Sequence, residues 1–242
     1  MLITGTRGLL ATHLRARLES DGVRVLPIER GATAQDFAIA SAEADAVVHL
    51  AGVTSSPDPE DFERGNVGTT AMLADAVRKA GRALPVLYAS SIRVAADTLY
   101  GRTKRDAEAI LVRLNAEIGN PVAIFRLPSF FGAWSRPDYN SAIATFCHQA
   151  ATGIPVVANT PDALLELVEL DVVVDAFAAA IAQPRSGVAY PQVEPTYSIR
   201  VGDAARIIGS FGAGESEETS LDPALIRALR RTYGAHEDRL KS

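Results

Sequence analysis

Ser91, Tyr100 and Lys104 are the side chains whose types and spacing best suit chemistry in this sequence. Tyr100 and Lys104 are four residues apart, so on a helix they share one face about one turn apart. A phenol is a weak acid or base at neutral pH, but a neighbouring ammonium lowers its pKa and favours the phenolate. With a serine hydroxyl to hold the reacting oxygen, the trio can exchange a proton with a carbonyl or an alcohol. The same spacing occurs by chance on many helices, so whether the trio is catalytic depends on the rest of the chain.

The segments around the trio predict that it lies at the edge of a parallel sheet. Residues 86–89 are an apolar run typical of a buried strand, and an amphipathic pattern predicts a helix from Tyr100 to about Glu117. The serine would then follow the carboxyl end of a strand, beside the start of a helix. Open α/β sheets bind their ligands at that place.

A glycine-marked turn near the start of the chain predicts a dinucleotide site. Residues 1–3 predict a strand, a helix should end at Ser20, and Gly5 and Gly8 lie between them. Glycines there let the backbone approach a pyrophosphate, which the helix amino terminus attracts.

The choice of cofactor depends on the end of a second predicted strand, residues 23–28. Glu29 follows it and would bind the ribose 2′-hydroxyl of NAD, whereas Arg30 suits the 2′-phosphate of NADP. Because Arg7 in the glycine turn adds a second cation, we expect NADP, with NAD less favoured. Two solvated arginines are the alternative interpretation.

The remaining patterns predict an α/β fold, a doubly wound parallel sheet of the Rossmann type with a small carboxyl-terminal substrate lobe. Residues 46–52 are apolar on both faces, as in a strand covered by helices, and His49 within them is interpreted as a core histidine. We expect further strands at 121–126, 153–157, 164–170 and 197–199, an irregular loop at 53–63 and a linker at 186–195. The predicted division is a dinucleotide-binding core at 1–132 with 160–182 returning to it, and a substrate lobe at 133–159 and 183–242.

Composition narrows the function classes. The net charge of -5, without a basic stripe, argues against a nucleic-acid partner. The single cysteine, Cys147, excludes an internal disulfide and is interpreted as a packing residue, and no metal site is indicated. We expect no signal peptide, because the chain opens on a strand. Residues 172–182 are too short an apolar run to span a membrane, so we expect a cytoplasmic protein with no membrane partner.

Several motifs resemble those of the extended short-chain dehydrogenase/reductases, the NAD-dependent epimerase/dehydratase family. The glycine turn resembles Thr-Gly-x-x-Gly-x-x-Gly with Ala11 at the last position, and residues 66–70 resemble the Asn-Val-x-Gly-Thr opening of a helix. Residues 126–132 resemble Arg-x-x-Asn-x-Tyr-Gly, with Ser129 in place of asparagine.

The match is closest to the reductase half of bifunctional capsular-polysaccharide enzymes that form UDP-N-acetyl-L-fucosamine precursors. It depends on residues 133–148 and on the short gap between Ser91 and Tyr100. Those enzymes carry a carboxyl-terminal metal-binding cupin domain for epimerisation. This chain ends before such a domain, so we expect no epimerisation at C3.

The resemblance implies roles for individual residues. Tyr100 would protonate the substrate oxygen, Lys104 would lower the pKa of Tyr100 and bind the nicotinamide ribose, and Ser91 would position the carbonyl. Because the gap before Tyr100 leaves no room for a specificity loop, residues 134–140 are expected to select the substrate. The cofactor contacts would be Gly5, Arg7, Gly8, Leu9, Leu10, Arg30, Leu50, Ala51, Gly52, Ala89, Tyr100, Lys104, Leu127 and Pro128, and the substrate contacts Ser91, Ser129, Arg136 and Asn140.

The leading hypothesis is an NADPH-dependent reduction of the keto group of a nucleotide-linked 4-keto-6-deoxy-hexose by a homodimer. Ile92 and Arg93 stand where a 4,6-dehydratase would need acidic residues, which counts against dehydration. Three alternatives stay open: a nucleotide-sugar 4-epimerase with retained NAD, a ketoreductase for a non-sugar ketone, and a non-catalytic NADP-binding protein.

Overall fold

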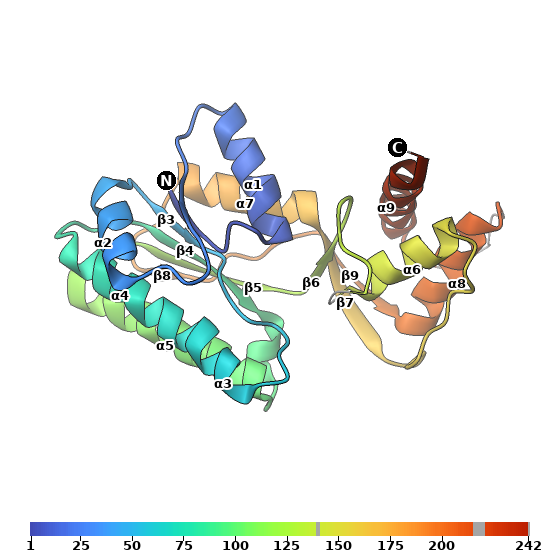
Figure 1. Ribbon diagram of the computed structural model, residues 1–242, viewed down its shortest axis with the longest axis horizontal. Coiled ribbons are helices and arrows are strands. Elements are labelled where there is room, and N and C mark those ends of the chain that lie inside the picture. Colours follow the sequence, from blue (N-terminus) through green and yellow to red (C-terminus); the bar gives the residue numbers. More distant parts are fainter. Residues whose placement is uncertain (139–140, 215–220, 242) are drawn as a thin grey trace. The chain divides into compact units, whose positions relative to one another are not determined.

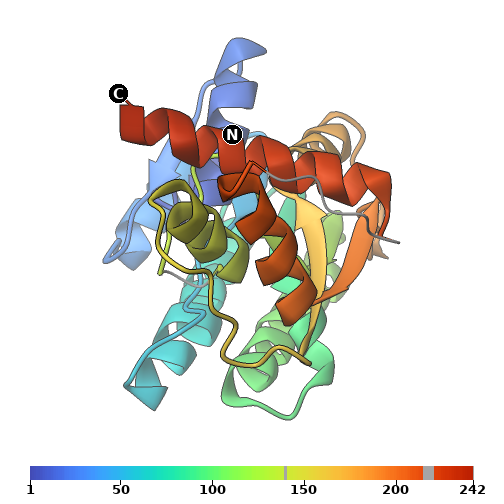
Figure 2. The same ribbon diagram turned by 90° about the vertical axis from the view of Figure 1, so that its right-hand side faces the viewer.

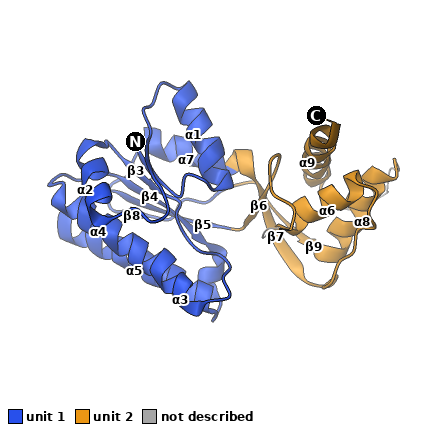
Figure 3. Ribbon diagram, in the orientation of Figure 1, with its two compact units in different colours: residues 1–127, 173–193 blue, residues 128–172, 194–242 orange. Residues whose placement is uncertain are grey.

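The chain folds into two units, each with a sheet of its own, in a computed structural model that describes residues 1–138, 141–214 and 221–241. The first unit comprises residues 1–127 and 173–193, and the second comprises 128–172 and 194–242 (Figure 3). These bounds differ from the predicted division, because residues 128–132 and 160–172 fall in the second unit and 183–193 in the first.

Six parallel strands form the sheet of the first unit in the order β2-β1-β3-β4-β5-β8, and the chain order reverses beside β1. The strands are β1 (Leu2–Thr4), β2 (Leu26–Ile28), β3 (Val47–His49), β4 (Val86–Ser91), β5 (Val122–Leu127) and β8 (Val188–Ala189). β8 lies within the segment expected to be a linker. The predicted doubly wound Rossmann fold is confirmed.

Helices cover both faces of this sheet (Figure 1). One face carries α1 (Leu9–Ser20) and α7 (Leu170–Ala182), and the other carries α2 (Ala34–Glu43), α4 (Thr69–Lys79) and α5 (Leu99–Ile118). Because both faces are covered, the central strands consist of continuous apolar runs. Val47, Val48 and Leu87 are at most 1 % exposed.

His49 is the buried core histidine that the sequence predicts. One ring nitrogen lies 2.7 Å from the Thr4 hydroxyl and the other 2.9 Å from the Thr70 hydroxyl. Burial, with a smaller contribution from the charge of Lys104, lowers the pKa of His49 to about 3. The ring is therefore neutral at physiological pH.

The segment between β3 and α4 is more ordered than the expected loop at 53–63. Asp58 accepts a hydrogen bond from the Glu60 amide (3.0 Å) and caps α3 (Pro59–Phe62), which has its proline at the first helical position. A π-helical turn, Glu63–Gly68, leads directly into α4. The loop prediction is wrong for 59–63, because these caps allow a short helix to form.

The second unit has a three-stranded sheet in the order β6-β7-β9. β6 (Ser129–Phe131) runs parallel to β7 (Leu164–Glu169), and β9 (Thr196–Arg200) pairs antiparallel to β7. Three helices pack on this sheet: α6 (Ala142–Ala151), α8 (Val201–Gly212) and α9 (Pro223–Lys241) (Figure 2). Phe131, Ile199 and Ile208 belong to its core, and Cys147 is buried there as a packing residue.

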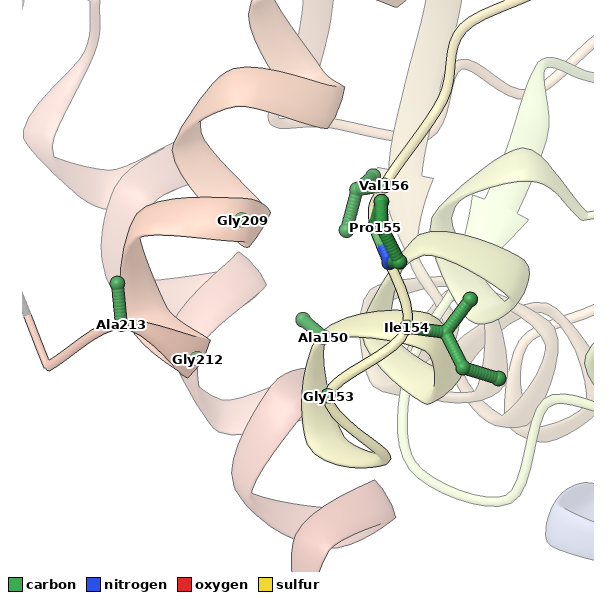
Figure 4. A pocket seen from close by; sticks show the side chains of 8 residues that line it. All are labelled: Ala150, Gly153, Ile154, Pro155, Val156, Gly209, Gly212 and Ala213. Carbon is green, nitrogen blue, oxygen red and sulfur yellow. The ribbon is translucent and has the colours of Figure 1, made fainter.

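The strand predicted at residues 153–157 is absent. After α6 the chain turns at Gly153 (φ 72°) and continues without regular structure, and Pro155 has no amide hydrogen to give to a sheet. This segment instead borders a cavity of about 280 Å³ (Figure 4). The lining residues, all without polar side chains, are Ala150, Gly153, Ile154, Pro155, Val156, Gly209, Gly212 and Ala213.

Candidate active site

The connection between Ser91 and Tyr100 is short because two caps build it. Ser91, 8 % exposed at the end of β4, accepts a hydrogen bond from the Arg93 amide (3.2 Å) and starts a 3-10 turn, Ile92–Ala95. Thr98 then caps α5 by accepting from the Gly101 amide (3.0 Å). Tyr100 therefore lies in the first turn of a helix that starts close to the end of β4.

Gly101 allows α5 to approach the 3-10 turn closely. A Cβ atom added to Gly101 would lie 2.5 Å from the carbonyl oxygen of Ala96 and as close to that of Arg93. Both atoms belong to the backbone, so no side-chain rotation could relieve the overlap. The glycine next to Tyr100 thus determines where the phenol can lie.

Tyr100 is a half-buried phenol whose surroundings keep it protonated. Burial raises its pKa, whereas a hydrogen bond with Ser91 and the positive charge of Arg93 lower it. The edge of the Phe62 ring packs against it, with ring centroids 6.5 Å apart. From the sequence we expect Lys104 to lower the pKa of Tyr100. The net direction in the structure is upward because burial outweighs the favourable interactions.

Lys104 is almost completely buried, at 4 % exposure. Its ammonium donates a hydrogen bond to the carbonyl oxygen of Ala89 (2.7 Å) and lies 4.3 Å above the ring centroid of Tyr88. Burial lowers the pKa of Lys104 and the charge of Glu108 opposes this shift, which leaves the pKa at about 7. Small changes around this ammonium therefore decide its charge near neutral pH.

The glycine turn fits a pyrophosphate. Gly5 has a left-handed backbone (φ 70°), and a Cβ atom there would lie 2.7 Å from the Ala51 nitrogen. Gly8 is the N-cap of α1 and offers no side-chain acceptor, so the first amides of Leu9 and Leu10 have no capping side chain. The side chain of Leu10 is buried, so it would contribute its backbone alone.

Glu29 contacts Arg7, which the sequence assigns to the 2′-phosphate of NADP. Its carboxylate lies 3.0 Å from Nε of Arg7 and accepts a hydrogen bond from the Thr6 hydroxyl. Arg7 and Glu29 are both exposed, and such ion pairs add little stability. Arg30 is also exposed, beyond the end of β2. Arg7 can therefore exchange Glu29 for a ligand, and the side chain of Arg30 is accessible to one.

Asn66 joins three segments beside Lys104. Its side chain bonds to the amide of Val53 (2.8 Å), to the Val53 carbonyl (3.1 Å) and to the Thr103 hydroxyl (3.0 Å). A Cβ atom on Gly52 would lie 2.9 Å from Oδ1 of Asn66 and 3.8 Å from Nζ of Lys104. The end of β3, the π-helical turn and α5 therefore meet at one place.

Most predicted site residues belong to the first unit. Leu50, Ala51 and Gly52 follow β3, Ala89 and Ser91 end β4, and the parallel register pairs Leu127 with Ser91. Pro128, Ser129 and Arg136 belong to the second unit, where Pro128 is half-buried and the other two are exposed. Asn140 lies outside the described residues.

Glu108, Arg126, Tyr88 and Phe62 are site neighbours that sequence reasoning missed. Glu108 is four residues beyond Lys104 on α5, a spacing that could have indicated it. Residues 1–138, 141–214 and 221–241 contain no group of three or more His, Cys, Asp or Glu residues arranged to hold a metal ion. Over the same residues, no helix combines the length and the apolarity needed to cross a membrane.

Comparisons with known proteins agree with this geometry. The model of a family described as "NAD dependent epimerase/dehydratase family" matches residues 1–194. A UDP-2-acetamido-2,6-beta-L-arabino-hexul-4-ose reductase from Pseudomonas aeruginosa is 42% identical over 236 residues, which are 96% of this chain and 63% of that protein. The resemblance inferred from the motifs is confirmed.

Solved structures give the same result for the fold. The capsular polysaccharide assembling protein CapF from Staphylococcus aureus superposes with a TM-score of 0.82 at 29% identity, over 97% of this chain and 64% of CapF. A UDP-glucose 4-epimerase with UDP-glucose from Thermotoga maritima gives 0.83 at 16% identity, over 99% of both chains, a likeness of fold alone. The chain thus spans less than two thirds of the reductase and of CapF.

Proposed function

The chain belongs to the NAD dependent epimerase/dehydratase family, and from this premise we propose that it reduces the keto group of a nucleotide-linked 4-keto-6-deoxy-hexose with NADPH. The observation that carries the substrate class is the 42% identity to a hexul-4-ose reductase across almost the whole chain. The trio Ser91, Tyr100 and Lys104 supports the reaction type, because it suits proton transfer to a carbonyl oxygen.

Three residues of the first unit have separate roles in such a reduction. Ser91 donates a hydrogen bond to the carbonyl oxygen and Tyr100 gives that oxygen its phenol proton. The raised pKa of Tyr100 keeps this proton in place until the oxygen becomes basic. When bound, the reduced dinucleotide supplies the hydride that adds to the keto carbon. Lys104, one turn along α5, stabilises the phenolate that remains and binds the nicotinamide ribose.

NADPH as the donor is supported by Arg7 and Arg30 and opposed by Glu29. A 2′-phosphate would replace Glu29 as the partner of Arg7, whose present ion pair is exposed and weak. We therefore expect Arg7→Ala to raise the KM for NADPH about tenfold or more and to leave the KM for NADH nearly unchanged. A wild-type preference for NADH would reject this choice and favour Glu29 as the ribose ligand.

The test of the function is ketone-dependent oxidation of NADPH, followed at 340 nm with UDP- and dTDP-linked 4-keto-6-deoxy-hexoses. The wild-type protein should turn over at least one of them, and Tyr100→Phe should lose turnover while binding NADPH as before. Equal activity of Tyr100→Phe would contradict the assigned acid. NAD⁺ retained tightly through purification would favour a 4-epimerase, and no response to any nucleotide sugar would favour a non-sugar ketone.

A homodimer through α4 and α5 is the assembly we propose, by resemblance to the family. The two helices pack side by side on one face of the sheet (Figure 1), and Val112 of α5 is 38% exposed there. Light scattering after gel filtration should give twice the chain mass, and Val112→Glu should halve it. A monomeric wild-type protein would reject the proposal.

A further inference from the structure

Glu108 is a buried carboxylate on the same face of α5 as Lys104, one turn further along. It is 4 % exposed and accepts hydrogen bonds from the Ser90 hydroxyl and from Arg126, whose Nη2 lies 2.6 Å from Oε2 and whose Nε lies 3.1 Å from Oε1. Burying a carboxylate is costly, so it is tolerated only with partners of this kind. The proposed reaction as described above gives Glu108 no task.

The titratable groups near Lys104 and Glu108 come from three strands and one helix. His49 of β3 is neutral because burial lowers its pKa to about 3. Tyr88 of β4 and Tyr100 of α5 are neutral because burial raises their pKa values. Arg126 of β5 is a cation. Among these groups and Glu108, the carboxylate of Glu108 is the sole anion.

Glu108 and burial act on the pKa of Lys104 in opposite directions. The negative charge of Glu108 favours the ammonium form of Lys104, whereas burial favours the neutral amine. Arg126 pairs with Glu108 through two nitrogens and is itself 47% exposed, so it offsets part of the negative charge. Its guanidinium also lies 4.8 Å from the ring centroid of Tyr190.

We propose that Glu108 is a positioning residue that keeps Lys104 charged, one turn along α5 from Tyr100, and that Arg126 limits how strongly it does so. This inference rests on the proposed function, because it gives the charge of Lys104 a purpose in the reduction. A neutral Lys104 could not stabilise the phenolate that proton transfer leaves on Tyr100. Ser90 and Arg126 hold the carboxylate in place, so its effect on Lys104 is built into the fold.

The protonation of Lys104 can be measured without turnover. The sequence has three lysines, Lys79, Lys104 and Lys241, so a sample with ¹³C at the lysine ε-carbons gives three resonances. Lys79→Arg and Lys241→Arg assign two of them, and Lys104 is followed from pH 5 to pH 11. The wild-type midpoint should lie at about 7.

The variants should move this midpoint in opposite directions. Glu108→Gln keeps an acceptor for Ser90 but removes the charge, so the Lys104 midpoint should fall by about 1 pH unit or more. Arg126→Met removes the competing cation, so the midpoint should rise. Glu108→Asp restores the charge and should return the midpoint toward that of the wild type. A purely structural role predicts no such opposition.

Activity then separates this inference from the proposed function. In the reductase assay, kcat should fall as Lys104 loses its proton, so the alkaline limb of the pH profile of kcat should shift in the same direction as the Lys104 midpoint in each variant. An unchanged Lys104 midpoint in Glu108→Gln, or shifts of the same sign in both variants, would overturn the role of Glu108 even if reduction is observed. Opposite midpoint shifts without any reduction would overturn the proposed function and leave the coupling between Glu108 and Lys104 standing.

Discussion

Replacing Lys104 with methionine is expected to stabilise the ligand-free protein while abolishing activity. The pKa of Lys104 is lowered from 10.5 to about 7, because burial outweighs the attraction of Glu108, so the folded state bears a cost for the charged amine. At about 1.36 kcal/mol for each pKa unit, that cost is roughly 5 kcal/mol at pH 6. Loss of the hydrogen bond to the Ala89 carbonyl offsets about 1 kcal/mol. Methionine is uncharged and flexible enough to fill the space, so the net gain should be roughly 3–4 kcal/mol.

The gain must depend on pH with a definite sign. Because the folded pKa is below the unfolded one, between pH 7 and pH 10.5 the unfolded chain binds a proton at Lys104 that the folded chain does not. The free energy of unfolding of the wild type therefore rises with pH through this window relative to Lys104→Met. The advantage of the variant should be largest at or below pH 7 and nearly absent at pH 10.

Urea unfolding of both proteins at pH 6, 7, 8 and 9 measures this difference directly. Lys79→Met is the matched control, because Lys79 is exposed on α4 and its replacement should leave the pH dependence unchanged. A Lys104→Met protein that is less stable than the wild type at pH 6, or whose advantage is the same at pH 6 and pH 9, would contradict a buried, charged Lys104 as the source of this cost.

Three further predictions follow from contacts near the site. Gly101→Ala places a methyl group against backbone oxygens, so kcat in the reductase assay should fall more than about tenfold and stability by about 1–3 kcal/mol; an unchanged kcat would show that the close approach does not position Tyr100. Asn66→Ala removes three hydrogen bonds, and urea unfolding should show a loss of about 1–3 kcal/mol. His49 has its folded pKa lowered to about 3, so below about pH 6.5 the unfolded chain binds a proton that the folded chain lacks and stability falls with acidification. His49→Asn should abolish this loss in unfolding curves between pH 4 and pH 7, and an equal acid sensitivity would contradict the assignment.

The sheet of the first unit could be predicted because its signals are local. Each central strand is a continuous apolar run, and Gly5 and Gly8 mark the turn between the first strand and its helix. The secondary-structure prediction is wrong where tertiary packing overrides the local pattern. Residues 153–157 are apolar and β-branched enough to suggest a strand, but they border a cavity beside α8, whose Gly209 and Gly212 leave space there. That placement depends on tertiary packing, which the local pattern does not contain.

The candidate site also combines features that are local in the sequence with features that depend on tertiary structure. The spacing of Tyr100 and Lys104 is a property of one helix, so it is visible in the sequence. The pairing of Glu108 with Arg126 requires the register of two strands: Ser90 of β4 lies opposite Arg126 of β5, and α5 lays Glu108 over both. Likewise, the net pKa shift of Tyr100 is set by burial, which no spacing reveals.

The edge strand β8 gives the chain an unusual order of assembly. β5 ends at Leu127, but its neighbour β8 begins at Val188, after β6, α6, β7 and α7. During synthesis, β5 therefore leaves the ribosome with an unpaired edge. β8 can pair with that edge only after much of the second unit has been synthesised. An exposed edge of this kind invites pairing with other nascent chains. We expect truncation after residue 150 to yield aggregated protein, and chaperone dependence to end only once residue 193 has left the exit tunnel.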